Sequence, residues 1–326
     1  MLPEISEPTN LCRPDGRLNR DAVGYSRSPL HTTNLRGWGR NKRWEYWGLV
    51  TPTHAVGMTI SNLDYLAVNQ LYVYDRTTGE EIATDVIGPG MRGASLSDEV
   101  GPLTAQLETK KLKMSFRDTD LGTHLSAKSD RIRLDLDAAN SGDCLAVVVP
   151  WDNRRFQYTV KDLARPVTGS IEVDGRAFPV EPGTTFAALD RGRGRWPYSL
   201  TWNWATACGV IDGHTIGLQL GGKWTDGTGS TENGITVDGK LTYWPHLVNW
   251  DYSTSDWYRP WRITGEFVDA TMTPFHVRMA RTNIGLIASS VQQAFGTWSG
   301  TAIDGSGREH RLDGLVGWAE QAKNRW

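Results

Sequence analysis

The chain has 326 residues and a formal net charge of −2, with 39% hydrophobic and 22% charged residues, 35 glycines and 15 prolines. This composition is typical of a soluble globular protein with one large domain or two ordinary ones, and it argues against fibrous and disordered classes. The lysines and arginines are scattered, so the strong basic field that nucleic acid or an anionic membrane needs is missing.

Cysteine usage and the first residues bear on the compartment. Cys12, Cys144 and Cys208 lie far apart, and their odd number fits neither a disulfide framework nor a zinc site. The start, MLPEISEPTN, has no basic segment followed by an apolar one, and no later run has the length of a membrane span. We therefore expect a cytoplasmic protein without a membrane span.

Short strands and tight turns dominate the chain. In KLKMSF (111–116) and RIRLDLD (131–137) apolar residues alternate with polar ones, which predicts strands with one dry and one wet side. Asp-Gly pairs at 174–175, 212–213 and 238–239 predict hairpin turns. Helical periodicity is confined to short stretches at 121–126 and 317–326. We expect an all-β fold of antiparallel strands, closed as barrels or folded as sandwiches, with few short helices.

A junction is expected near the middle of the chain. KDLARPVTGS (161–170) combines a residue-Pro step with small polar residues, as inter-domain linkers do. The sequence therefore predicts two β halves, residues 1–165 and residues 166–326.

Several kinds of active site find no support. The seven histidines are isolated, without the spacing of a zinc site, and the Gly-x-Ser-x-Gly elbow of serine hydrolases is missing. The segment GRGRWP lacks the spacing of a phosphate-binding loop, although its arginines have the chemistry to hold a carboxylate. We expect neither a metal nor an organic cofactor.

Residues 24–65 hold the first candidate site residues. Arg27, His31, Trp44 and Glu45 mix hydrogen-bonding groups with aromatic ones, yet Trp44 could simply begin a core strand with Glu45 paired to an arginine. Asp64 follows in SNLDYLA. If it faces a barrel interior, its pKa is raised and it is a candidate general acid or base; if it faces water, it is an ordinary strand aspartate.

The stretch RGRGRWPYSLTWNWATACG (191–209) is the densest in tryptophan, and Asp190 precedes it. An aspartate beside arginines usually forms a structural ion pair. Period-two alternation places Tyr198, Trp202 and Trp204 on one face, where they either fill a core or line a cavity. Glu232, in KWTDGTGSTENG (223–234), is either a turn residue or a carboxylate set near aromatics.

Taken together, several motifs carry a resemblance that covers nearly the whole chain: GYSRSPLHTTNLRGWGRNKRWEYWGLVTP, SNLDYLA, DRGRGRWPYSLTWNWATACG, GKWTDGTGSTENGITVDGK and PWRI. The sequence resembles the bacterial domain-of-unknown-function family 2804. It is also distantly similar to tandem lipocalin-like proteins of the calycin group, such as carotenoid 1,2-hydratase. The resemblance implies two packed lipocalin-like β halves and an apolar ligand pocket in one half or between them.

The same resemblance implies a function. The chain would bind a small apolar molecule, such as an isoprenoid, lipid or polyketide, and act on it as a cofactor-free hydratase, lyase or cyclase. The candidate acids are Asp64, Asp190 and Glu232. The candidate binding residues are Arg27, His31, Trp44, Glu45, Arg193, Tyr198, Trp202 and Trp204. Two alternatives stay open: a non-catalytic carrier of such a molecule, and a carbohydrate-active protein with tryptophan platforms and paired carboxylates.

Overall fold

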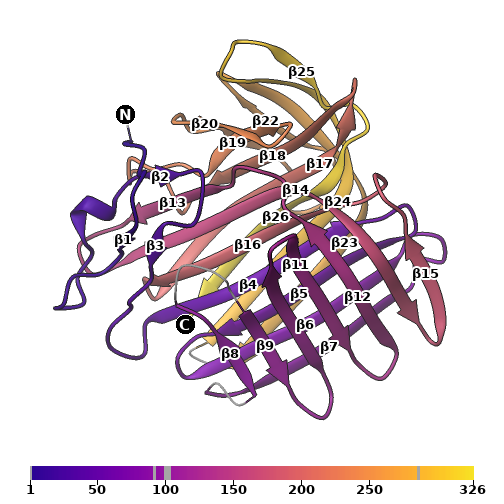
Figure 1. Cartoon of the computed structure of the whole chain (residues 1–326), viewed down its shortest axis with the longest axis horizontal. Helices are drawn as coiled ribbons and strands as arrows, with labels where there is room; N and C mark the ends of the chain where they lie inside the picture. The colour runs from indigo at the N-terminus through magenta and orange to yellow at the C-terminus, as the bar shows by residue number, and fades with distance from the viewer. Residues whose placement is uncertain (1, 91–92, 99–103, 285–286) are drawn as a thin grey trace.

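Two large antiparallel sheets make up most of the protein (Figure 1). The computed structural model describes residues 2–90, 93–98, 104–284 and 287–326. Outside the two sheets lie a parallel pair, β1 (Thr9–Asn10) with β3 (His31–Thr32), and the single-turn 3₁₀ helix η1 (Arg20–Ala22). Nowhere in these ranges is there a helix with the length and apolarity to span a membrane.

The first sheet has 14 strands and forms the N-terminal half. Its strands follow in the spatial order β7 (Glu81–Pro89), β6 (Leu66–Asp75), β5 (His54–Asn62), β4 (Asn41–Val50), β16 (Phe186–Arg195), β14 (Phe156–Val173), β12 (Ile132–Ala139), β11 (Gly122–Lys128), β10 (Lys113–Thr119), β9 (Thr104–Glu108) and β8 (Ala94–Leu96). β13 (Leu145–Pro150) and β15 (Arg176–Val180) also pair with β14, and β2 (Tyr25–Ser26) pairs with β13. The sheet curls until β5 meets β8 and β9, which encloses a core around Trp47 and Phe116.

The second sheet has 10 strands and forms the C-terminal half, orange to yellow in Figure 1. Its spatial order is β20 (Lys240–Trp244), β19 (Asn233–Val237), β18 (His214–Gly222), β17 (Ser199–Ile211), β26 (Val316–Arg325), β24 (Ile287–Ile303), β23 (Val268–Ile284), β22 (Trp261–Gly265) and β21 (Asn249–Asp251), with β25 (Glu309–Arg311) paired to β24. Its own core gathers around Trp244, Trp261 and Trp298.

The two halves meet face to face: β4, β14 and β16 of the first sheet contact β17, β18 and β26 of the second. Successive side chains of a strand point to opposite faces, so each of these strands serves both a core of its own half and the contact between halves. Tyr46, Trp204, Phe295 and Trp318 form one buried cluster in that contact, which we call the inter-half layer.

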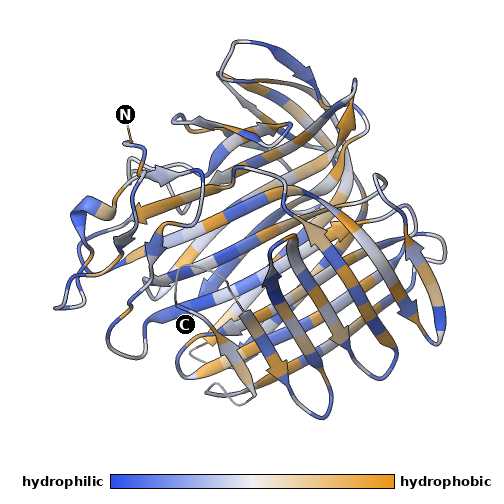
Figure 2. Cartoon of the chain, viewed as in Figure 1, coloured by the Kyte–Doolittle hydropathy of each residue, from blue (hydrophilic) through white to orange (hydrophobic). Residues whose placement is uncertain are grey.

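The predicted all-β fold is confirmed, down to several of its local signals. Along β12 buried and exposed residues alternate without exception, and Figure 2 shows the resulting hydrophobic and hydrophilic bands on neighbouring strands. At Asp174-Gly175, Asp212-Gly213 and Asp238-Gly239 both residues have positive φ, between 49° and 81°. That is the conformation of the tight hairpin turns that right-twisted strands favour.

The two predicted helices are wrong. Residues 122–128 form β11, and residues 316–325 form β26 between β17 and β24. The alanines, glutamine and lysine of the second stretch favour a helix in isolation, but pairing on both edges and burial on both faces decide the outcome.

The expected boundary after residue 165 falls inside the long strand β14, and the chain leaves the first sheet only between β16 and β17. The Arg165-Pro166 step lies beside a β-bulge, with Ala164 at a φ of 51°, where β14 bends from its partner β13 toward β12. A proline beside small polar residues occurs both in linkers and at β-bulges, so the sequence alone does not distinguish the two. The division into two domains stays a prediction, with sheet membership favouring a later boundary.

We predict that Gly48→Ala destabilises the packing of the two halves. A Cβ at this β4 position would lie 2.4 Å from Cη2 of Trp318, a ring that is itself buried in the inter-half layer. Overpacking of this kind costs about 1–3 kcal/mol of unfolding free energy, measurable by urea denaturation. Gly88→Ala is the matched control, because a Cβ on this β7 glycine meets nothing within 4 Å. Equal midpoints for the two variants would contradict the packing argument.

Candidate active site

The centre of the inter-half layer holds a buried lysine between two carboxyl groups. Nζ of Lys161 lies 2.9 Å from Oδ1 of Asp190 and 3.8 Å from Oε1 of Glu232. Lys161 and Asp190 are direct partners in the ladder between β14 and β16, whereas Glu232 precedes β19 of the second sheet. The side chains of Lys161 and Glu232 are 2% and 1% exposed. The cluster is therefore built from both halves and largely shielded from solvent.

Glu232 is poised to hold a proton at neutral pH. Its pKa is raised from 4.5 to about 7, chiefly by burial; the charge of Lys161 opposes the rise and that of Asp190 adds to it. Its Oε2 accepts the indole N–H of Trp224 at 2.7 Å. A carboxyl group with a pKa near the working pH is effective both as an acid and, once ionised, as a base.

Glu320, on β26, is a second carboxyl group of the same kind. Its pKa is raised from 4.5 to about 7, chiefly by burial and also by the charge of Asp190. The charges of Lys161 and Arg278 oppose the rise. Its Oε1 accepts the indole N–H of Trp202 at 3.0 Å, and its Oε2 accepts from Nε2 of Gln293 at 3.2 Å. That amide also donates to the hydroxyl of Tyr46 at 3.1 Å. Glu232 and Glu320 thus lie on the same network of charges around Lys161 and Asp190.

Indole rings surround these groups. The ring of Trp196, which is 1% exposed, packs against several other indoles with centroids 5.2–5.8 Å apart. These rings, with Trp196 itself, are called the tryptophan cluster here: Trp44, Trp151, Trp202, Trp224 and Trp326. Trp204 is not part of this cluster. Nζ of Lys161 lies over its indole, 4.3 Å from the ring centroid. Such faces stabilise positive charge, whether on a side chain or on a reacting molecule.

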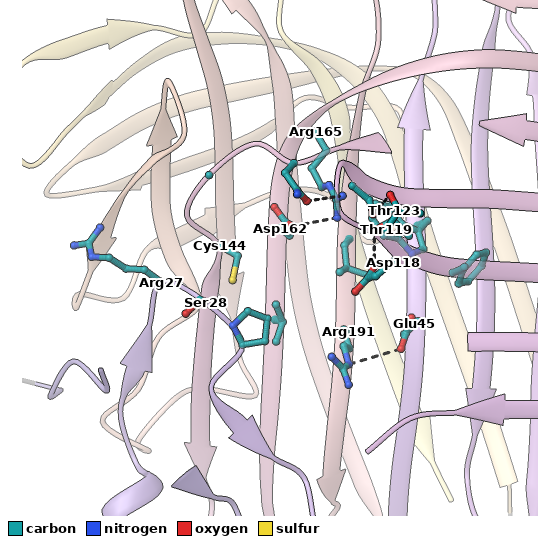
Figure 3. A pocket seen from close by; sticks show the side chains of 18 residues that line it. Arg27, Ser28, Glu45, Asp118, Thr119, Thr123, Cys144, Asp162, Arg165 and Arg191 are labelled. Carbon is teal, nitrogen blue, oxygen red and sulfur yellow. Dashed lines mark hydrogen bonds and ion pairs between the residues drawn. The ribbon is translucent and has the colours of Figure 1, made fainter. Parts of the chain in front are cut away.

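A separate cavity of about 420 Å³ lies inside the first half (Figure 3). One wall carries Glu45, whose Oε1 lies 3.7 Å from Nε of Arg191 and 2.9 Å from Nη2 of Arg193. Across the cavity Asp162 pairs with Arg165 at 3.2 Å. Burial lowers the pKa of Arg193 to about 10, so this guanidinium stays charged at neutral pH. Glu45 and Asp162 are each held by arginine, which favours binding over proton transfer here.

The structure brings five of the predicted residues into or beside one cluster: Asp190, Glu232, Trp44, Trp202 and Trp204. Their roles stay predictions. Asp64 lies elsewhere, in the turn between β5 and β6 with a φ of 72°. Its carboxylate accepts the backbone N–H groups of Gly39 and Asn41 at 2.5 and 3.0 Å and pairs with Arg43 at 3.4 Å. Those contacts anchor a loop.

The remaining predicted residues lie outside this cluster. Glu45 lines the first-half cavity, and Arg193 pairs with it from behind the cavity wall. Arg27 also lines this cavity and pairs with Glu4 and Asp143. His31 is buried against Tyr158, and its Nε2 lies 2.9 Å from the carbonyl of Ala22. Burial lowers the pKa of His31, which leaves it neutral at pH 7.

Tyr198 directly precedes β17 and is 41% exposed. The guanidinium of Arg40 lies over its ring at 5.7 Å. It therefore lines a surface groove and not the buried cluster.

Sequence reasoning missed Lys161 and Glu320. Lys161 was hidden in the expected linker 161–170, and Glu320 in the expected terminal helix. The sequence held a signal for Glu320. Trp318, Glu320 and Ala322 are two residues apart, so in a strand they share one face, the face that Trp318 turns to the inter-half layer. Among the described residues no group of three or more His, Cys, Asp or Glu lies close enough together to hold a metal ion.

We predict that Glu232 and Glu320 make the protein less stable as pH rises from about 4.5 to about 7. In that window the unfolded carboxyls release protons that the folded ones retain, since the folded pKa is about 7 for both. Each group then lowers the unfolding free energy by up to about 3 kcal/mol above pH 7. Glu320→Gln keeps an acceptor for Trp202 but cannot ionise. Urea denaturation at pH 5 and pH 8 should therefore give a smaller loss for the variant than for wild type; an equal loss would contradict the raised pKa.

Solved structures share the fold at low sequence identity. Kievitone hydratase from Nectria haematococca matches with a TM-score of 0.53 and 10% identity, covering 94% of this chain and 98% of that one. CghA in complex with Sch210972 matches with a TM-score of 0.54 and 11% identity, covering 91% and 89%. Both are lipocalin-like tandem-barrel proteins, and the likeness establishes the fold alone.

No curated protein matches the chain in sequence. A family model does, over residues 3–326, which is nearly the whole length. The chain therefore belongs to the family described as Domain of unknown function (DUF2804).

Proposed function

We propose that the protein binds a small apolar molecule, such as an isoprenoid, lipid or polyketide, against the tryptophan cluster and acts on it as a cofactor-free hydratase, lyase or cyclase. One observation carries the proposal: two fully buried carboxyl groups, Glu232 and Glu320, each have a pKa near 7 and each accept an indole N–H from that cluster. Acids, aromatic faces and a closed environment are what protonation of a carbon–carbon double bond requires.

The reaction would use the residues as follows. A protonated Glu232 or Glu320 gives its proton to one alkene carbon, and a C–H bond forms from the π electrons. The indole faces stabilise the carbocation that results. Water then adds to the cation and loses a proton to the carboxylate, which restores the acid. In a cyclase a second double bond attacks the cation in place of water, and the new cation loses a C–H proton to the carboxylate, which restores the acid. In a lyase the acid protonates the hydroxyl group, water leaves, and the carboxylate removes a proton from the neighbouring carbon.

The charges of Asp190 and Lys161 act on the two glutamic acids in opposite directions. Asp190 is the near partner of Lys161 at 2.9 Å, while Glu232 is 3.8 Å away. The negative charge of Asp190 discourages ionisation of both glutamic acids, because like charges at short range in a buried site repel. Lys161 has the opposite effect on both, so Asp190 and burial are what keep a proton available at neutral pH.

The relatives lend limited support. Kievitone hydratase is named for the addition of water, which is one of the three reaction types proposed. At 10% identity the shared property is the fold, so the relative supports the class of protein and not the residues.

A carrier is the second candidate, and the first-half cavity favours it. Its carboxylates Glu45 and Asp162 are paired with arginines, as expected of a site that binds without chemistry. A carbohydrate-active protein has less support, because the tryptophan rings pack on one another instead of lining an open cleft with their faces.

Native mass spectrometry of the protein from its own host, followed by organic extraction, should reveal a bound apolar molecule at one per chain. Incubating that molecule or its dehydrated form with enzyme in D₂O should place deuterium on carbon. We predict that Glu232→Gln and Glu320→Gln reduce this incorporation by about 10²–10⁴-fold, the usual contribution of a general acid. Ligand binding, followed by tryptophan fluorescence, should persist.

Glu266→Gln is the control, since Glu266 is exposed and pairs only with His246 at 3.2 Å among the described residues. Full incorporation by both cluster variants would refute the acid assignment. Stoichiometric binding without any turnover by wild type would favour the carrier.

A further inference from the structure

A groove of about 470 Å³ opens beside the tryptophan cluster. It lies where the segment before β4, the turn between β13 and β14, and the end of β16 meet. Trp196 is part of its wall. The same ring packs at 5.6 Å on Trp202 and at 5.5 Å on Trp224, the donors to Glu320 and Glu232. Two successive indoles, Trp196 and then Trp202 or Trp224, therefore separate the groove from the two acids.

The groove is strongly basic in a chain whose formal net charge is −2. Its lining includes Arg40, Arg154, Arg155 and Arg195 against a single carboxylate, Asp152. Asp152 is committed to Arg155, with Nε at 2.7 Å from its Oδ2. Three arginines are left over.

None of these three arginines, Arg40, Arg154 and Arg195, pairs with an aspartate or glutamate side chain within the described ranges. Arg40 donates to the main-chain oxygen of Trp326 at 3.3 Å. Nε of Arg195 is buried without a hydrogen-bond partner. A guanidinium that leaves bulk water costs free energy unless it is paired and hydrogen-bonded. A bound anion would supply the missing partner for these arginines.

We propose that this groove recognises an anionic group, a carboxylate or a phosphate, on the otherwise apolar ligand. The inference rests on the proposed function, because it takes Trp196 as the outer wall of the same site. Planar guanidinium groups bind both anions through paired N–H donors. With the anion held by Arg154 and Arg195, the apolar part lies against Trp196, pointing toward the acids. The substrate class is then an amphipathic anion with one end fixed at the groove.

The experiment compares two fluorescent probes that differ in charge, anilinonaphthalene sulfonate and neutral N-phenylnaphthylamine. Arg154→Gln, which changes an exposed side chain, and Arg195→Gln should each weaken sulfonate binding by about 10-fold, the loss of one charge-assisted contact. Binding of the neutral probe should stay within about twofold. Arg262→Gln is the control, since Arg262 is exposed and pairs with Asp269 on the second half.

Displacement of the sulfonate probe by dodecanoate, dodecyl phosphate and dodecanol then distinguishes the two kinds of anion. The tighter binder of dodecanoate and dodecyl phosphate identifies the group as a carboxylate or a phosphate. Equal displacement by dodecanol would overturn the inference, as would equal weakening of both probes or unchanged sulfonate binding in both arginine variants. Those results would not contradict the assignment of Glu232 and Glu320 as acids. That assignment fails by a different result, full deuterium incorporation in the glutamine variants. Failure of every probe and alkyl ligand to bind wild type would overturn both.

Discussion

Beside the inter-half layer, Lys161 lies among three carboxyl groups that are largely shielded from solvent, and the balance of charge there sets which of them keep a proton. Lys161 can neutralise one of them, and Asp190 is the nearest. Burying an additional ionised carboxylate costs several kcal/mol. Lys161 and, for Glu320, Arg278 offset this cost only in part, since both pKa values are still raised. Glu232 and Glu320 therefore hold protons at a pH where surface glutamates are ionised. A structural requirement of charge balance thus produces two acids.

The same strands build this layer and the first-half cavity. In β16 Leu189 belongs to the core of the first half, and Asp190 next to it faces the other way, toward Lys161. In β4 Glu45 points to the cavity and Trp44 to the tryptophan cluster. Because the side-chain period of a strand is two, a shift of register by one residue would exchange the two environments. The register of these strands therefore determines both sites at once.

The sequence predicted the strands, the Asp-Gly turns and two of the cluster's acids because these rest on local patterns. Asp190 and Glu232 stood beside aromatic residues within short segments. Lys161 and Glu320 could not be found in that way, since their environment is made by pairing between strands distant in the chain. Asp64 misled for the opposite reason: its surroundings looked like a strand, but a positive φ places it in a turn. Which face of a strand meets another sheet is a tertiary property that alternation alone leaves open.

The segment RGRGR shows how far one local pattern can reach. It is a strand, β16, and the glycines between its arginines are required by packing: a Cβ on Gly192 would lie 2.1 Å from the indole of Trp44, and one on Gly194 2.3 Å from Oε1 of Gln157. Gln157 accepts the indole N–H of Trp196 at 2.6 Å. The glycines thus let two members of the tryptophan cluster approach the strand, while Arg193 on the opposite face holds Glu45. Alternation of the largest cation with the smallest residue is what allows a single strand to carry charge on one face and indoles on the other.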